Sequence, residues 1–221
     1  MSEAAKRRTV AKPFAMTAKS GRKRAEIVRV ATEIINNKSF ALATMSDIAA
    51  ELGLRDATRY YYYPNKVALA YACHVSSLER FEALLGQAGR SGSDGLDKVR
   101  QFVRNLLSDA AQNGPQLYFG DFSYLAEAER AAVSAWLARL EKVLEGFLEE
   151  GVADKSIVPC ETGLVLQLIL GTLIWLSKWV PSVKDITADR LMDAIEIASL
   201  SGLARKQHEI GDQKRPTKAL E

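Results

Sequence analysis

The sequence predicts an all-α protein, with a small N-terminal domain of three helices followed by a larger C-terminal helical domain. Two observations support this prediction. Apolar residues recur at three- and four-residue intervals from about residue 24 onward, which is the period of one helix face. Strand-like alternation of apolar and polar residues appears nowhere, and the breaks between periodic segments fall at Gly, Pro and Asn.

The first 22 residues form a basic arm without a sustained apolar period. Residues 1–24 hold eight of the 30 Lys and Arg residues against one acid, Glu3, so this segment carries +7 while the whole chain carries +3. Such an arm cannot bury enough apolar surface to order itself, and we expect it to be flexible. A cationic arm ahead of a globular body is typical of polyanion binding, although a merely solvated tail would have the same composition.

Three helices are predicted between the arm and residue 63. The first covers about 24–37, where Ile27, Val30, Ala31, Ile34 and Ile35 share one face. Thr44 and Asp47 have the spacing of a capping box, which opens the second helix. Gly53 can take the left-handed conformation that ends this helix and turns the chain into a third helix at about 55–62. Two short helices joined by a tight turn form a helix-turn-helix, here at about 44–63.

A longer helix is expected from Pro64-Asn65-Lys66, with Asn65 as its N-cap. Residues 86–95 are rich in Gly and Ser and are predicted to form a loop. Later helices are expected at about 96–112, 116–125, 127–150, 161–180 and 188–204. The predicted domains are a basic flexible arm at 1–22, a helix-turn-helix domain at 23–70, a regulatory and dimerisation domain at 71–204 and a disordered tail at 205–221.

The segment from Thr44 to Lys66 has the residues expected of a DNA-reading helix and its flanks. Thr44, at a helix N-terminus, can present its hydroxyl to a phosphate, and Lys66 is suitably placed for another phosphate contact. The start of the third helix would direct compact and basic side chains at base edges in the major groove. The candidates for these contacts are Arg55, Asp56, Ala57, Thr58 and Arg59.

Four consecutive tyrosines follow on the same helix, from Tyr60 to Tyr63. Consecutive helical residues point in different directions, so the four rings cannot all be buried. We expect Tyr63 and one earlier ring to pack in the core, and Tyr61 and Tyr62 to contact phosphates or bases through their hydroxyls. Tyr60 is counted among the candidate DNA contacts as well.

These residues resemble the TetR family of transcriptional regulators, which carry a Thr, then Ile-Ala, a Gly-Val-Ser turn and a Tyr-rich segment ending in Phe-x-x-Lys. The resemblance covers about residues 24–70. The chain departs from the family pattern at Arg55, Ala57, Arg59, Tyr63 and Val67, so the bases that it reads cannot be carried over. At the positions of this pattern the chain has Thr44, Ile48-Ala49, Gly53-Leu54 and Thr58-Arg59-Tyr60-Tyr61-Tyr62-Tyr63-Pro64-Asn65-Lys66.

The segment 161–180 is so apolar that a membrane span has to be considered. A span needs about 20 mostly apolar residues, whereas this run is interrupted by Gln167 and closed by Lys178. A helix that is apolar on nearly all sides favours burial against the core on one face and against a partner subunit on another. The resemblance implies that 161–180 and 188–204 form the interface of a homodimer, an isologous contact that matches an inverted-repeat operator.

Aromatic residues are frequent in the C-terminal domain and could line a largely apolar pocket for a small-molecule effector. Any one of them would more often pack in the core, and His74 would more often hydrogen-bond there. The candidate pocket residues are His74, Phe102, Tyr118, Phe119, Phe122, Trp136, Arg139 and Trp175.

The remaining composition argues against an enzyme. The chain has two histidines, His74 and His208, no metal-ligand spacing and no phosphate-binding glycine loop, so neither a catalytic site nor a cofactor or metal is predicted. Cys73 and Cys160 lie far apart in a chain without a secretory signal, and we interpret both as buried thiols in a reducing cytoplasm.

The sequence thus predicts a cytoplasmic, sequence-specific DNA-binding regulator. The preferred hypothesis is a repressor that a small, largely apolar ligand releases from a palindromic operator. The alternative is a non-specific or architectural DNA-binding protein that uses the basic arm, and activation instead of repression is compatible with the same residues.

Overall fold

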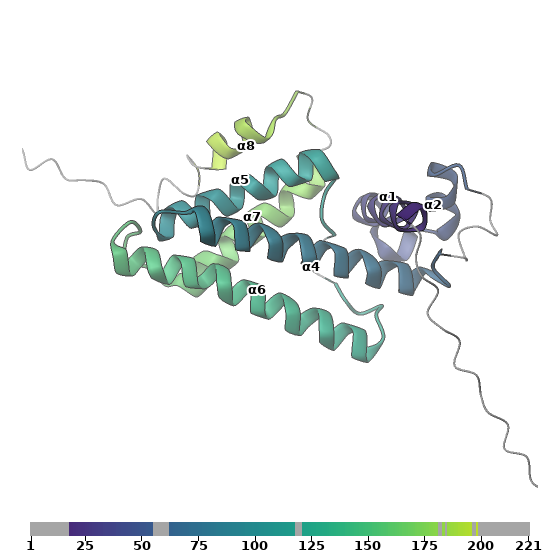
Figure 1. Ribbon diagram of the computed structural model, residues 1–221, viewed down its shortest axis with the longest axis horizontal. Coiled ribbons are helices and arrows are strands. Elements are labelled where there is room, and N and C mark those ends of the chain that lie inside the picture. Colours follow the sequence, from purple (N-terminus) through teal and green to yellow (C-terminus); the bar gives the residue numbers. More distant parts are fainter. Residues whose placement is uncertain are drawn as a thin grey trace, which may run out of the picture. The chain divides into compact units, whose positions relative to one another are not determined.

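The computed structural model describes residues 18–54, 62–117, 121–180, 183, 185–195 and 198, and the elements in this part of the chain are α-helices. They belong to two compact units, one ending at Cys73 and the other beginning at His74. Helix α4 (Lys66–Ser91) begins in the first unit and continues into the second (Figure 1). The all-α fold predicted from the sequence is confirmed.

The first unit contains α1 (Ala18–Leu42), α2 (Met45–Glu51) and the first turns of α4. Helix α1 is longer at both ends than the segment predicted at about 24–37, and it is interrupted at Ser39, whose φ is 72°. Its aliphatic face is buried at Ile27, Val30, Ala31 and Ile35. Helix α2 packs against α1 and buries Ile48 and Ala49.

Local hydrogen bonds set both ends of α2. The Thr44 hydroxyl accepts a hydrogen bond from the Asp47 backbone N–H at 3.0 Å, and the Asp47 carboxylate accepts one from the Thr44 N–H at 2.9 Å. At the other end Gly53 has φ 60°, and the N–H groups of Gly53 and Leu54 donate to the carbonyls of Ala50 and Ala49. This is a Schellman motif. The predicted capping box and the glycine turn are both confirmed. Of the predicted third helix, residues 55–61 lie outside the described part of the chain.

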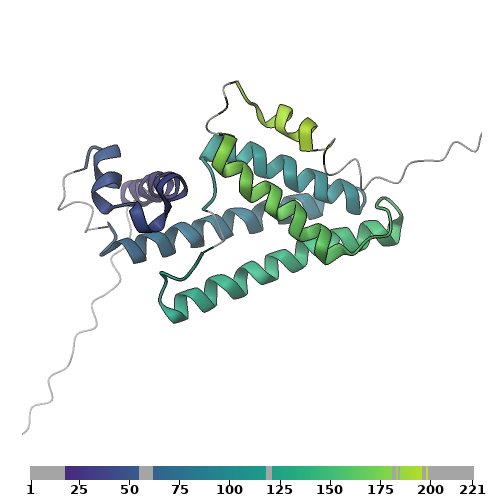
Figure 2. The ribbon, with the colours of Figure 1, turned by 180° about the vertical axis from the view of Figure 1, so that it is seen from behind.

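The second unit contains the later turns of α4 with α5 (Gly95–Asn113), α6 (Glu127–Asp154), α7 (Thr162–Trp179) and α8 (Ala188–Ile195). Helix α5 packs against α6 and α8, and α6 packs against α7, as Figures 1 and 2 show. Phe102 of α5 is fully buried, and its ring meets that of Phe81 of α4 edge to face at 5.0 Å. None of the described helices is long and apolar enough to cross a membrane.

The loop predicted at residues 86–95 was wrong, because α4 continues to Ser91 and α5 begins at Gly95. Glycine in a helix interior costs about 1 kcal/mol relative to alanine. Burial of Leu84, Leu85 and Ala88 offsets this cost. Glycine also allows a close approach here, since a Cβ on Gly89 would lie only 3.3 Å from the ring of Phe147.

Two further expectations are corrected. The described residues of the predicted helix at 116–125 are not helical: Gln116 and Leu117 have no regular secondary structure, and Asp121 accepts a hydrogen bond from the Ser123 N–H at 2.8 Å to form a turn. Helix α6 also runs past the break expected at Gly151 and ends at Asp154. Gly151 is buried, because α6 meets the start of α5 at this residue.

The crossing of α5 and α6 depends on two facing glycines. A Cβ on Gly95 would collide with the backbone N and Cα of Gly151 and with the carbonyl oxygen of Phe147. The N–H of Gly95 also donates to the Asp154 carboxylate at 2.9 Å, and the N–H of Leu96 donates to the Ser156 hydroxyl at 3.1 Å. The two helix ends therefore hold one another at backbone contact distance.

Gly95→Ala is expected to lower the free energy of unfolding by about 1–3 kcal/mol, because two backbones must separate to admit one methyl group. Urea denaturation at fixed protein concentration measures this change. Gly146→Ala is the control, since it lies in α6 and its Cβ would meet nothing within 4 Å. That substitution should raise stability by up to about 1 kcal/mol, and equal effects of the two would contradict the close crossing.

Candidate nucleic-acid interface and ligand cavity

Within the first unit, the hydroxyl of Thr44 is engaged in capping α2. It accepts from the Asp47 N–H and donates to the Asp47 carboxylate at 2.8 Å, and the side chain lies at the surface. The Asp47 carboxylate also pairs with Lys38 at 3.1 Å. The hydrogen bonds from Thr44 lower the pKa of Asp47, so the carboxylate stays ionised at neutral pH.

The residues predicted to read DNA bases lie outside the described part of the chain: Arg55, Asp56, Ala57, Thr58, Arg59, Tyr60 and Tyr61. Of the tyrosine run, Tyr62 is half-buried and Tyr63 is buried. The guanidinium of Arg24 in α1 lies over both rings, 5.9 Å from the Tyr62 centroid and 5.6 Å from that of Tyr63. The prediction that Tyr63 packs in the core is confirmed, and the DNA contact of Tyr62 stays a prediction.

Lys66 has a structural role that was not predicted from the sequence. Its ammonium donates to three carbonyls at the end of α1 and just beyond it, those of Phe40 at 2.9 Å, Ala41 at 3.4 Å and Ala43 at 3.1 Å. It also lies 4.3 Å from the centroid of the Phe40 ring. Carbonyls at a helix C-terminus lack partners within the helix and attract a cation. Lys66 therefore joins the first turn of α4 to the end of α1.

The N-cap of α4 follows the sequence prediction, because the Asn65 side-chain oxygen accepts a hydrogen bond from the Ala68 N–H at 2.8 Å. Further along α4, the Cys73 thiol is buried and lies 3.6 Å from the Val28 carbonyl oxygen. Burial raises the pKa of Cys73 to about 12, so this thiol is unreactive. Cys160 is only half-buried, contrary to the expectation that both cysteines are buried.

In the second unit, His74 is fully buried with its Nε2 2.7 Å from the Tyr124 hydroxyl. Phe122 meets the imidazole edge to face at 5.1 Å. Burial lowers the pKa of His74 to about 4, and the charge of Asp121 opposes this effect only in part. His74 is therefore a neutral, hydrogen-bonded core residue at physiological pH.

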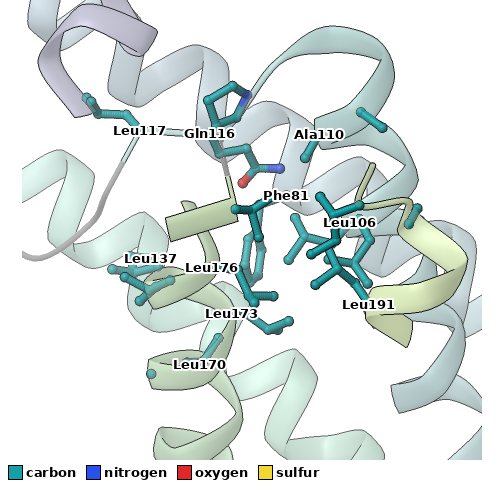
Figure 3. Close-up of a pocket in the computed structure, with 18 of the residues that line it drawn as sticks. Phe81, Leu106, Ala110, Gln116, Leu117, Leu137, Leu170, Leu173, Leu176 and Leu191 are labelled. Atoms are coloured by element: carbon teal, nitrogen blue, oxygen red, sulfur yellow. The ribbon is translucent and has the colours of Figure 1, made fainter. Parts of the chain in front are cut away.

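A cavity of about 500 Å³ lies in the second unit, and its lining is largely aliphatic (Figure 3). Leu106 and Ala110 of α5 form one wall, and Leu173 and Leu176 of α7 form another. Phe81 of α4 and Leu191 of α8 contribute as well. The polar lining residues are Gln116, Glu141, Gln167 and Thr187.

This cavity is not lined by the predicted pocket residues. Trp136 is half-buried and donates from Nε1 to Glu82 at 3.2 Å, and Arg139 is exposed with its guanidinium bonded to the Ala135 carbonyl. Trp175 is 65% exposed on α7. Phe102 packs against Phe81, and His74 and Phe122 form the cluster described above. Tyr118 and Phe119 lie outside the described residues. Aromatic rings fill space between helices, whereas the cavity lies where aliphatic faces fail to meet.

Two contacts fix the wall of the cavity at residues 115–117 to α4. Arg80 of α4 donates to Asp109 at 2.8 Å and to the Gly114 carbonyl at 2.7 Å. The Ser77 hydroxyl accepts a buried hydrogen bond from the Leu117 N–H at 2.9 Å. Since Phe81 also lines the cavity, one stretch of α4 touches both the cavity and its wall.

Helix α7 carries an apolar stripe that the other described residues leave exposed. Leu164, Leu168 and Trp175 are 56%, 66% and 65% exposed and follow one another at helical spacing. Contiguous exposed apolar surface of this kind marks an interaction site. Within the described residues, no group of three or more His, Cys, Asp or Glu side chains is placed to hold a metal ion.

Comparison with known families identifies both parts of the chain. Residues 27–73 match the model for bacterial regulatory proteins of the tetR family, and residues 92–202 match the model for the C-terminal domain of tetracyclin repressor-like proteins. The chain belongs to the TetR family. It is therefore a DNA-binding transcriptional regulator with an N-terminal helix-turn-helix domain and a C-terminal regulatory domain. Among curated proteins, no sequence match was found.

Solved structures share the fold of this TetR-family chain. The regulator PfmR from Thermus thermophilus is 22% identical with a TM-score of 0.67, and the match covers 81% of this chain and 99% of PfmR. The ketosteroid regulator KstR2 of Mycobacterium tuberculosis is 16% identical with a TM-score of 0.72, covering 83% and 96%. AibR in complex with isovaleryl coenzyme A and operator DNA is 19% identical with a TM-score of 0.65, covering 78% and 95%.

The polar residues of the cavity in this TetR-family chain were not predicted from the sequence. One signal was present in α6, where Glu141 lies four residues after Leu137 and so interrupts an apolar face of the helix. No comparable signal marked Arg24 or Lys66 as structural, because their partners are distant in sequence.

Lys66→Met is expected to lower the free energy of unfolding by about 1.5–3 kcal/mol, since it keeps the apolar stem over Phe40 but removes the charged donor. Urea denaturation measures the loss. Lys38→Met in the same unit is the control, because its ion pair with Asp47 is exposed to solvent and should contribute little to stability. Unchanged stability with lost DNA binding would instead assign Lys66 to the phosphate contact predicted from the sequence.

The burial of His74 predicts a pH dependence of stability. The unfolded chain takes up a proton at this residue near pH 6.5, but the folded chain does so only near pH 4, so the free energy of unfolding falls as the pH decreases through this window. The loss attributable to His74 should reach at most about 3 kcal/mol. Urea denaturation at pH 7 and at pH 5 should show a smaller difference in His74→Gln than in the unmodified chain. His208→Gln, at the other histidine, should keep the full difference, and an undiminished difference in His74→Gln would refute the assignment.

Proposed function

We propose that this TetR-family chain is a homodimeric repressor that a small, largely apolar molecule releases from an inverted-repeat operator in the cytoplasm. The single observation that carries the proposal is the largely aliphatic cavity of about 500 Å³ in the C-terminal domain. Its volume lies within the range of about 300–1,000 Å³ typical of small-molecule sites.

The solved structures support a small-molecule effector. AibR has been captured with isovaleryl coenzyme A and with operator DNA, so one protein of this fold meets both kinds of ligand. KstR2 is described as a ketosteroid transcriptional regulator. The ketosteroid skeleton and the isovaleryl group in these names are apolar, whereas coenzyme A itself is polar and anionic, so only the apolar groups agree with the lining of the cavity in this chain.

Helix α4 offers a physical route from effector to DNA. A ligand in the cavity would meet Phe81 and press on the wall that Ser77 and Arg80 hold. The same helix begins at Lys66, which is bonded to the end of α1 in the DNA-binding domain. If the ligand prefers one setting of α4 and the operator prefers another, the two oppose each other by linkage.

The exposed stripe on α7 supports a homodimer. A helix face carrying Leu164, Leu168 and Trp175 in contact with water is unfavourable, and a second copy of the same face would remove it from water. An isologous dimer has two-fold symmetry, and its two DNA-binding domains would read two half-sites of an inverted repeat.

Selection of bound sequences from a random duplex pool at about 150 mM salt tests the proposal. The full chain should enrich an inverted repeat with specificity of roughly 10³-fold or more over random DNA. Leu168→Glu should break the dimer and abolish the enrichment, because it places a charge in the apolar interface. Size-exclusion chromatography reports the oligomeric state of each protein.

Ala132→Glu on the exposed surface of α6 is the matched control and should leave both dimer and enrichment intact. Deletion of residues 1–17, the part of the basic arm that precedes α1, should weaken binding without changing the selected motif. Binding without any enriched motif, lost on deletion of the arm, would replace this proposal with non-specific DNA binding.

A further inference from the structure

The described polar side chains of the cavity include a carboxyl group but no cationic group. The described residues that line it include one carboxyl group, Glu141, and two amides, Gln116 and Gln167, but no lysine, arginine or histidine. A ligand that carries a negative charge would therefore meet no cation among these residues. It would also approach a carboxyl group, which repels it when ionised.

Glu141 and Gln167 lie at the same level of the cavity. Helices α6 and α7 pack together and run in opposite directions (Figure 2). Glu145 Oε1 of α6 lies 3.2 Å from the position that a Cβ on Gly163 of α7 would take, which fixes their relative register. One turn before Glu145 is Glu141, and one turn after Gly163 is Gln167, so an antiparallel pair places these two residues at the same level of the two helices.

This level is the mouth of the cavity. Gln167 and Gly171 line the cavity and are also exposed in the single chain, so this end of the cavity opens beside the α7 stripe that the proposed homodimer would cover. In Figure 3 the amide of Gln116 lies at the opposite end of the labelled residues from Leu170, with Phe81, Leu173 and Leu176 between them. Apart from Thr187, the cavity is therefore a largely apolar space between a polar mouth and the amide of Gln116.

The carboxyl group of Glu141 has no ion-pair or hydrogen-bond partner among the described residues. Its neighbour in sequence, Lys142, pairs instead with Glu145 at 3.0 Å and approaches Glu149 at 3.9 Å. Glu141 is half-buried, and its burial is the cause that raises its pKa. A partly buried polar group without a partner costs stability, and a ligand that supplies a donor recovers that cost.

We propose that the cavity takes an elongated apolar molecule whose polar head donates a hydrogen bond, such as an alcohol or a protonated amine, and that Glu141 and Gln167 bind this head. The same arrangement rejects a free carboxylate of equal chain length. This inference rests on the proposed function only in treating the cavity as the effector site.

Isothermal titration of the full chain with decanol, decylamine and decanoate, each below its micelle concentration and without DNA, tests the proposal. Decanol and decylamine should bind, and decanoate should bind about tenfold more weakly or not at all. Glu141→Gln should reduce the difference in affinity between decylamine and decanoate. The amide can donate to a carboxylate, and it carries no charge that would attract an ammonium. We expect about a tenfold gain for decanoate and a similar loss for decylamine.

Two controls make each outcome decisive. Glu149→Gln, exposed on α6 away from the cavity lining, should leave all three affinities unchanged. Ala110→Phe fills the cavity and should abolish binding of decanol and decylamine; undiminished binding would place the probes elsewhere and overturn the proposal. Equal binding of decanoate and decylamine to the unmodified chain, or an unchanged preference in Glu141→Gln, would overturn it as well.

Measuring whether each probe releases the operator DNA distinguishes a failure of this inference from a failure of the proposed function. Decylamine that binds the cavity but leaves the operator complex intact would refute effector release while the ligand class stands. Decanoate that binds best and releases the operator would support the repressor and refute the ligand class.

Discussion

The continuity of α4 is the constraint on which the rest of the structure depends, because this one helix belongs to both compact units. Lys66 fixes its start by bonding to the carbonyls that α1 leaves without partners. Later turns supply Phe81 to the cavity and hold the adjoining wall through Ser77 and Arg80. If a ligand shifts α4 as proposed, the residues that fix the two halves of this helix would oppose or permit that shift.

Local chemistry made part of the fold predictable. The Thr44 capping box, the Gly53 turn and the Asn65 N-cap each depend on residues within a few positions of one another, and each formed as expected. The prediction of a loop at 86–95 was wrong because the composition of this stretch favours a loop, whereas its burial against other helices favours the continuation of α4. A window of sequence shows intrinsic preference only, and the packing that overrides it comes from residues such as Phe147, far along the chain.

The cavity was less predictable than the DNA-binding motif for a related reason. Apolar and aromatic residues have the same periodicity whether they face a neighbouring helix or an empty space, so composition directed the prediction to aromatic residues such as Trp136 and Trp175. The structure shows aliphatic residues around the space, and Trp175 at the surface beside Leu168. Which face of α7 meets the core and which remains exposed follows from helix packing, which no single helix specifies.

Glu141 illustrates how a break in a local rule points to a site. Among the described residues, nothing compensates this half-buried carboxyl, and an aliphatic residue at the same position would continue the face begun by Leu137. A half-buried glutamate without a partner among the described residues costs stability, and a ligand that supplies a hydrogen-bond donor would recover that cost. The nearby polar residues Ser77 and Arg80 differ from Glu141, because each is hydrogen-bonded to other residues of the fold. The contrast between satisfied and unsatisfied polar groups around one cavity, and not its size, is therefore what favours a ligand with a hydrogen-bond donor.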